Sequence, residues 1–510
     1  MGFEGHFSRA GGILLHPTSL PGPHGIGDLG PQAHAFIDWL RGAGCRIWQV
    51  LPLGPTGYGN SPYQAHSVFA GNPNLISLEL LVRDGLLTAS DLLHGPKRVA
   101  LHRRHAARVD YARIIPRKMN LLQRAYRNFE KSHLPEMQQE FRQFRSEAAS
   151  WLDDFSLFMA IKESLGDTSW LRWPEVLRMR EASALQTARR ALGSAAERHA
   201  FYQFLFFRQW MAVRQHAHHS GIQIIGDVPI FAAEDSADVW SNPALFCLDD
   251  NRMPTAWSGV PPDYFSPTGQ LWGNPLYRWE EHKVDRYSWW RRRLKATFEI
   301  VDIARLDHFR GFEACWSTPA GSATAENGMW SPGPADDFFE ALQDDFHDPL
   351  SNEGLPLVAE DLGEITPEVV RLRDRYRLPG MKVLQFGFSH PANPFLPHNY
   401  PQHCVAYTGT HDNDTSRGWL SHASSADSSF ARRYLVTPAR SFSWGMIRAI
   451  WSSVAALAIA PMQDVLDLGT NGRMNYPGRL DGNWEWRMRD GDLAVATADR
   501  LRDFNTVYGR

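Results

Sequence analysis

Eight short apolar runs, rich in β-forming residues, recur along the chain and usually end at Gly, Pro, Asp or Glu. They cover residues 12–16, 47–51, 222–227, 301–307, 357–360, 381–386, 404–408 and 454–459. Helical patterns separate several of the runs; residues 31–41, for example, begin with Pro and place their apolar side chains on one face. Alternating strands and helices form parallel sheets, and eight such units predict an α/β fold of the (β/α)8 TIM-barrel type. A doubly wound open sheet is the competing fold, but no Gly-x-Gly-x-x-Gly follows the first run to support it.

The spacing of the runs is uneven, which predicts insertions in the barrel. The second and third runs lie about 170 residues apart, far more than the dozen or so that a crossover needs. We expect residues 66–220 to form a mainly helical insertion between these two strands. Residues 228–285, rich in Pro, Gly, Trp and Asp, are expected to form a loop insertion after the third strand and part of a substrate groove. We expect residues 1–510 to form a single catalytic unit built on the barrel.

The balance of charges limits the partners of the chain. Lys and Arg number 53 against 56 Asp and Glu, for a net charge of −3, so we expect no nucleic-acid partner and interpret basic residues 97–108 as a solvated helix face. No stretch reaches about 18 uninterrupted apolar residues, so no membrane partner is expected. The N-terminus lacks the apolar region of a signal peptide and the four cysteines show no close spacing, which favours a cytoplasmic protein. The sequence carries no signal for the oligomeric state.

Charged and polar side chains stand where four of the predicted strands end: Asp227, Arg305, Asp307, Glu360, His411 and Asp412. In a (β/α)8 barrel these ends meet at one mouth. Cleavage of a glycosidic bond needs one carboxylate at the anomeric carbon and a carboxylic acid that protonates the leaving oxygen. Arg305 and Asp307 are two residues apart on one strand, so their side chains face the same side. There the guanidinium of Arg305 can hold the carboxylate of Asp307 ionised. A structural salt-bridge network at the barrel rim is the alternative interpretation.

Seven stretches of the sequence match the motifs of a known family: residues 54–64, 261–277, 304–311, 358–363, 409–415, 461–464 and 482–487. Residues 304–311 read ARLDHFRG, and residues 409–415 read GTHDNDT. In this order they resemble the amylomaltase, or disproportionating-enzyme, family of 4-α-glucanotransferases, which is glycoside hydrolase family 77 of the α-amylase superfamily. The resemblance covers residues 11–490.

The resemblance implies a retaining enzyme that transfers segments of α-1,4-glucans and maltooligosaccharides to the 4-OH of glucose or another glucan by double displacement. No cofactor and no metal are implied. Asp307 would be the nucleophile, Glu360 the acid/base, and Asp412 the third carboxylate that holds and distorts the sugar ring. Six further residues would bind substrate, with the two aromatic residues stacking on glucose units: Tyr63, Asp227, Trp272, Arg305, His308 and His411.

Two alternatives remain open from the chemistry of the residues alone. An α-1,4-glucan hydrolase differs only in that water attacks the intermediate, and a non-catalytic glucan-binding barrel has no need of an acid beside a nucleophile.

Glu360 follows an apolar run, and we expect its partial burial beside a carboxylate to raise its pKa, as an acid catalyst requires.

Overall fold

The computed structural model describes residues 7–93, 107–262, 266–346, 354–479 and 481–510. Eight parallel strands close into a barrel in the order β1-β12-β11-β10-β9-β6-β3-β2. The strands are β1 Ala10–Leu14, β2 Ile47–Gln49, β3 Gln223–Pro229, β6 Ile303–Asp307, β9 Leu357–Ala359, β10 Gly380–Val383, β11 Cys404–Tyr407 and β12 Leu457–Pro461. The predicted (β/α)8 barrel is therefore confirmed, and each predicted run overlaps one barrel strand.

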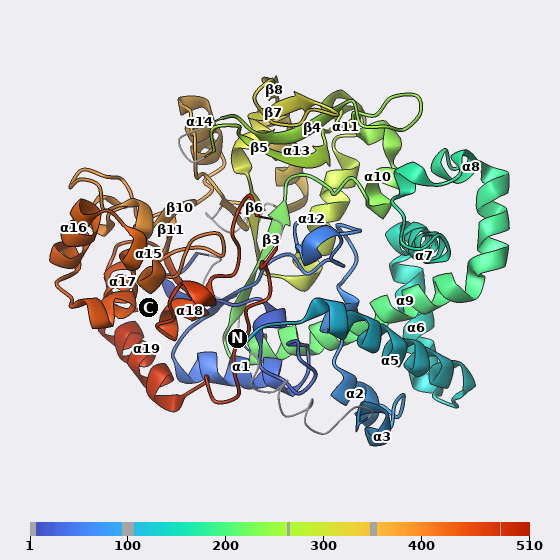
Figure 1. The fold of residues 1–510 in the computed structure, drawn as a ribbon, viewed down its shortest axis with the longest axis horizontal. Helices are drawn as coiled ribbons and strands as arrows, with labels where there is room; N and C mark the ends of the chain where they lie inside the picture. Colours follow the sequence, from blue (N-terminus) through green and yellow to red (C-terminus); the bar gives the residue numbers. More distant parts are fainter. Residues whose placement is uncertain (1–6, 94–106, 263–265, 347–353, 480) are drawn as a thin grey trace.

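The barrel strands are buried on both faces, which explains why they appear in the sequence as continuous apolar runs. All residues of β1, β11 and β12 are buried. Pairing of β1 with β12 closes the ring, and Leu14 lies opposite Pro461 in that register. Helices cover the outside of the barrel, as Figure 1 shows. They include α1 Pro31–Gly42, α12 Ser288–Ile300, α13 Ala335–Phe346, α14 Pro367–Arg375, α17 Phe442–Trp451 and α19 Val495–Tyr508.

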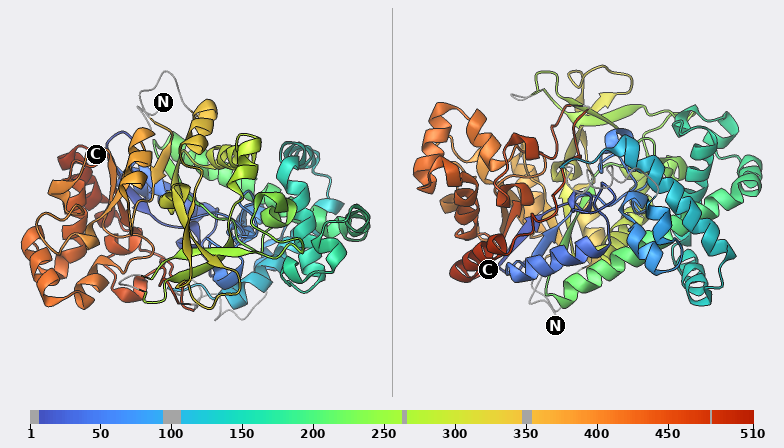
Figure 2. Two further views of the ribbon diagram at one scale, coloured as in Figure 1. Left: turned by 90° about the horizontal axis from the view of Figure 1, so that it is seen from above. Right: turned by 60° about the horizontal axis from the view of Figure 1, so that its bottom comes forward.

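Between β2 and β3 the chain runs through a group of helices. These are α2 Leu78–Arg83, α3 Ala89–Leu93, α5 Tyr111–Lys131, α6 Pro135–Glu147, α7 Ala149–Ser164, α8 Glu175–Arg178 and α9 Ala182–His219. Aromatic side chains join the long helix α9 to its neighbours; the rings of Phe129 and Phe201 stack with their centroids 4.4 Å apart. In both views of Figure 2 these helices lie on one side of the barrel, opposite α15 Ser416–His422, α16 Ser425–Leu435 and α17. Most of the basic stretch 97–108 lies outside the described residues.

The expectation that residues 228–285 form a loop insertion is wrong in one respect, because this segment also contains regular structure. It includes α10 Ala237–Ser241, β4 Ala256–Val260, β5 Gln270–Pro275 and α11 Trp279–Val284. Strands β4 and β5 join β7 Ala314–Pro319 and β8 Met329–Pro332 in an antiparallel sheet of order β5-β4-β7-β8. The sequence hid these strands because they contain Gly, Asn and Pro and are mostly half-buried, so they lack a clear apolar pattern.

The antiparallel sheet lies over β3 and β6 at the top of the view in Figure 1. The residues after β3 and after β6 both contribute to it, since β4 pairs with β7. It therefore stands at the end of the barrel where the predicted functional residues are found. None of the helices in the described ranges is long and apolar enough to cross a membrane.

Candidate active site

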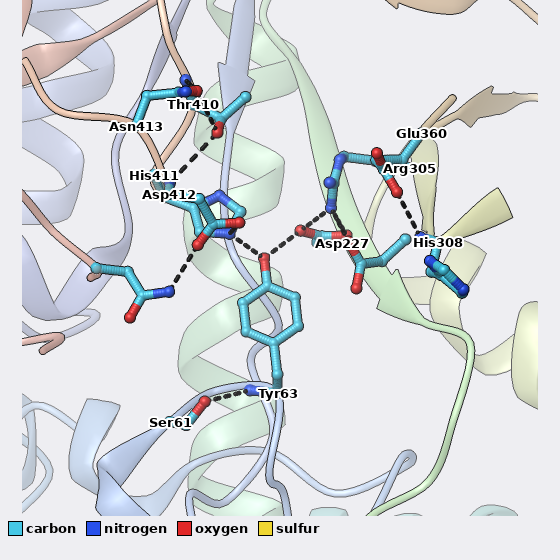
Figure 3. A network of polar contacts seen from close by, with 12 residues as sticks. Ser61, Tyr63, Asp227, Arg305, His308, Glu360, Thr410, His411, Asp412 and Asn413 are labelled. Carbon is cyan, nitrogen blue, oxygen red and sulfur yellow. Dashed lines mark hydrogen bonds and ion pairs between the residues drawn. The ribbon is translucent and has the colours of Figure 1, made fainter. Parts of the chain in front are cut away.

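Three barrel strands and one loop bring the predicted carboxylates to the same end of the barrel. Asp227 lies within β3 and faces Arg305 of β6 in the strand register, and Asp307 is the last residue of β6. Glu360 directly follows β9, and its backbone N–H donates to the carbonyl of Leu306, which precedes Asp307. The loop after β11 carries His411 and Asp412. Figure 3 shows Asp227, His411 and Asp412 near the hydroxyl of Tyr63, with Glu360 beside His308.

Arg305 joins two of the carboxylates at the base of the site. Its Nη1 lies 2.8 Å from each oxygen of Asp227 and 2.8 Å from Oδ1 of Asp307. The Arg305 side chain is only 4% exposed, whereas that of Asp307 is 28% exposed. Arg305 therefore provides a fixed positive charge beneath Asp307, while Asp307 itself remains accessible to a bound molecule.

Glu360 is held by backbone groups on either side of it. Its Oε2 accepts a hydrogen bond from the N–H of His308 at 2.8 Å, and its Oε1 accepts one from the N–H of Leu362 at 3.0 Å. His308 adopts a left-handed backbone conformation, with φ of 55°, at the turn that follows β6. This turn directs the His308 N–H toward Glu360 and fixes the carboxyl group beside Asp307.

The surroundings of Asp307 and Glu360 disfavour a negative charge on both groups at once. Burial raises the pKa of Glu360 to about 8; Arg305 opposes this rise, and the charge of Asp307 adds to it. Burial also raises the pKa of Asp307 to about 7 against the attraction of Arg305. The ion pair with Arg305 favours Asp307 as the ionised member of the pair, and the pKa of Glu360 is raised by its burial and by the charge of Asp307.

Tyr63 links the two halves of the site. Its hydroxyl donates to Oδ2 of Asp227 at 2.7 Å and lies 2.8 Å from Nε2 of His411. The Tyr63 ring also stacks on the His411 imidazole, with centroids 5.3 Å apart and an interplanar angle of 18°. One face of the Tyr63 ring is therefore covered by protein, and its stacking on a glucose unit stays a prediction.

The Asp412 side chain is 45% exposed, more than those of Asp227 and Asp307. Its Oδ2 lies 3.3 Å from Nε2 of His411, and its Oδ1 accepts a hydrogen bond from the amide of Asn475 at 2.6 Å. The guanidinium of Arg473 donates to the Asp412 carbonyl at 2.5 Å. Within the loop, Oδ1 of Asn413 accepts from the N–H of Thr410 at 2.8 Å, as Figure 3 shows. These bonds hold the carboxylate at the open side of the site.

Trp272 of β5 approaches the site from the antiparallel sheet. Its ring meets the His308 imidazole edge to face, with centroids 4.8 Å apart and an interplanar angle of 87°. Burial lowers the pKa of His308 to about 3, so the imidazole is neutral at this position. Among the described residues His308 contacts Glu360 through its backbone N–H, whereas its ring packs against Trp272. The predicted site residues are thus all near the barrel mouth.

Sequence reasoning missed three residues that support the site. Asn475 and Arg473 hold Asp412, and Sδ of Met381 accepts from Nε of Arg305 at 3.4 Å. Asn475 and Arg473 lie in an irregular segment after β12 with no periodic pattern, and nothing in the sequence singled out Met381 within its apolar run.

Within the described ranges no group of three or more His, Cys, Asp or Glu is arranged to hold a metal ion. Residues 263–265 of the second family motif lie outside the described residues.

Comparisons with known proteins agree along nearly the whole chain. A family model described as 4-alpha-glucanotransferase, of glycoside hydrolase family 77, matches residues 15–494. The 4-alpha-glucanotransferase of Thermus thermophilus is 50% identical over 503 residues, which cover 97% of both chains. That of Synechocystis is 48% identical over 506 residues, which cover 98% of both chains.

A solved structure gives the same result for the fold. The amylomaltase from Streptococcus agalactiae in complex with acarbose superposes with a TM-score of 0.92 at 37% identity, covering 98% of this chain and 99% of that one. The family model and the full-length relatives together span nearly the whole chain. The chain therefore belongs to the 4-α-glucanotransferase family, glycoside hydrolase family 77.

Proposed function

We propose that this 4-α-glucanotransferase moves segments of α-1,4-glucan by a retaining double displacement, with Asp307 as nucleophile and Glu360 as acid/base. One observation carries the assignment of roles. Asp307 ends β6 and Glu360 directly follows the adjacent strand β9; Asp307 is paired with Arg305, and Glu360 has its pKa raised to about 8. An ionised carboxylate beside a protonated one is what the first step of the reaction requires.

In the first step, Asp307 attacks the anomeric carbon as the bond to the leaving oxygen breaks, and Glu360 gives its proton to that oxygen. A glycosyl ester on Asp307 and a shortened glucan result. In the second step, the ionised Glu360 takes the proton from the 4-OH of an acceptor, whose oxygen attacks the anomeric carbon and releases Asp307. The two steps conserve the α configuration and return both carboxyl groups to their starting states.

The binding residues divide between the two sides of the scissile bond. Tyr63, His411 and Asp412 are connected to one another near Asp227, and the exposed Asp412 carboxylate is suited to accept hydrogen bonds from the hydroxyls of the attacked ring. Trp272 is connected through His308 to Glu360, which acts on the leaving and entering oxygens. We therefore assign Trp272 to the acceptor side, with strands β4 and β5 contributing to the groove.

A test with maltotriose separates transfer from hydrolysis. Transfer converts two maltotriose molecules into glucose and maltopentaose, and repeated rounds give longer chains. Hydrolysis gives only glucose and maltose. Size-resolved analysis of the products should show maltopentaose and longer glucans; products no longer than maltotriose would identify a hydrolase and overturn the proposal.

The place of this reaction in the cell is part of the proposal. All four cysteines, Cys45, Cys247, Cys315 and Cys404, are free thiols. Free thiols fit a reducing compartment, so we assign the enzyme to the cytoplasm, where its substrates would be α-1,4-glucans and maltooligosaccharides.

A further inference from the structure

A small cavity is lined by His411 together with residues at the ends of β1 and β12. Its volume is about 20 Å³, and its polar lining residues are His16, Ser19, His411 and Gln463. A cavity of at least roughly 10–15 Å³ with two to four polar partners can hold one water molecule. His16 follows β1 after one residue and is only 6% exposed, and its Nδ1 has no hydrogen-bond partner among the described residues.

The hydrogen bonds around Tyr63 fix which nitrogen of His411 carries a proton. Asp227 is paired with Arg305 and can only accept, so the single hydroxyl proton of Tyr63 is donated to Asp227. The Tyr63 oxygen must then accept from Nε2–H of His411 at 2.8 Å. Asp412, 3.3 Å from the same nitrogen, is also an acceptor. His411 therefore carries its proton on Nε2.

The opposite nitrogen of His411 then needs a donor. Burial lowers the pKa of His411, and it lowers that of His16 to about 3, with the His411 charge adding to the effect. Both rings are therefore neutral, and Nδ1 of His411 is an acceptor. Within the described chain no side chain or backbone group donates to that nitrogen. A hydrogen-bond donor at that nitrogen would stabilise the tautomer with the proton on Nε2, whereas without a donor the proton of a neutral imidazole can move to the other nitrogen.

We propose that His16 is a positioning residue for this enzyme: through one water molecule in the cavity it supplies the donor to Nδ1 of His411 and so keeps the His411 proton on Nε2. Gln463 gives the water a third polar partner. With the proton on Nδ1 instead, the Nε2 lone pair would face the Asp412 carboxylate, and Tyr63 would have to turn its hydroxyl from Asp227 to His411. The inference rests on the proposed function, because it assumes that Tyr63, His411 and Asp412 act on the attacked sugar ring.

Replacement of His16 tests this relay. His16→Leu should lower kcat for maltotriose disproportionation on the order of tenfold, with KM changed by less than about threefold, as expected for coupling through a shared hydrogen-bond network. His16→Asn or His16→Gln, each of which places an amide near one of the ring nitrogens, should restore most of the loss. If His16→Leu does not fold, His16→Phe, which keeps an aromatic ring without nitrogen, takes its place.

A double-mutant cycle distinguishes the relay from a general loss of stability. In a Tyr63→Phe background the hydroxyl that His411 binds is absent, so the same His16 replacement should cost about twofold or less. His282→Leu is the control, because His282 is another buried histidine but packs against Tyr277 and Trp279 in an aromatic cluster. It should lower the temperature of unfolding and leave kcat unchanged.

Two results would overturn the inference. One is an unchanged kcat in His16→Leu, and the other is an equal loss in the Tyr63→Phe and wild-type backgrounds. Either result with an active wild type leaves the proposed function standing. A wild type that forms no maltopentaose would instead refute the function itself.

Discussion

At the scale of single residues, the role of each side chain in this site depends on the groups that it contacts. Arg305 serves two carboxylates at once, and because it is buried, removing it would leave the charges of Asp227 and Asp307 uncompensated. Asp227, Asp307 and Glu360 were found by examining the ends of the predicted strands, because functional side chains in a barrel collect at those ends. It could not find Asn475 or the backbone role of His308, since both depend on how irregular loops fold against the site.

The raised pKa of Glu360 predicts how the activity depends on pH. Glu360 must be protonated in the first step, so kcat/KM for maltotriose should fall as the pH rises through about 8. Activity should also fall at acidic pH, because Asp307 must be ionised to attack. A pH–rate profile measures both limbs. A rate that stays constant or rises between pH 8 and about 10 would show that no acid with the raised pKa of Glu360 is needed.

At the scale of whole elements, strands whose residues are continuously buried were predicted from the sequence. Strands that pair with partners distant in the sequence were missed. The barrel strands lie in apolar runs, and all eight were predicted. The antiparallel sheet was not, because β4 pairs with β7 across about 50 intervening residues and neither strand has a regular apolar pattern. The sheet matters for function, since its strand β5 carries Trp272 toward His308.

Trp272 should act on the acceptor rather than on the attacked sugar. Trp272→Ala should slow transfer on the order of fivefold more than the competing hydrolysis, since a stacking contact contributes about 1 kcal/mol and water needs no such platform. Products of maltotriose resolved by size give both rates. The control is Trp316→Ala on β7, where the indole donates to the Ala325 carbonyl and meets Trp330; it should leave the ratio of transfer to hydrolysis unchanged. Equal losses of both activities in Trp272→Ala would exclude an acceptor contact.

At the scale of the whole molecule, the C-terminal Arg510 and Arg9 tie the start of β1 to the segment before β12. The Arg510 guanidinium donates to the carbonyls of Trp451 and Ala10, and Arg9 donates to that of Ser453. These contacts join the start of β1 to the segment before β12, the two strands that close the ring. The closed (β/α)8 barrel was predicted from the sequence. The position of the helical insertion on one side of the barrel did not, because it depends on packing between α9 and neighbours distant in sequence.

The central claim for the molecule is that Asp307 forms a covalent glycosyl ester while Glu360 protonates the leaving oxygen. Fluoride leaves without a proton, whereas a sugar oxygen does not. Glu360→Gln should therefore be nearly inactive on maltotriose but should still let Asp307 attack α-maltosyl fluoride. Because the amide that this substitution introduces cannot activate an acceptor, the ester should accumulate. Asp307→Asn should react with neither substrate, because an amide is too weak a nucleophile.

Intact-protein mass spectrometry of the Glu360→Gln variant after mixing with α-maltosyl fluoride tests this most directly. We predict a mass increase of one maltosyl unit, carried after tryptic digestion by the peptide Leu306–Arg310 that contains Asp307, and no increase in the Asp307→Asn variant. A label on a peptide that contains Asp412 instead, or full activity of either variant on maltotriose, would contradict the account.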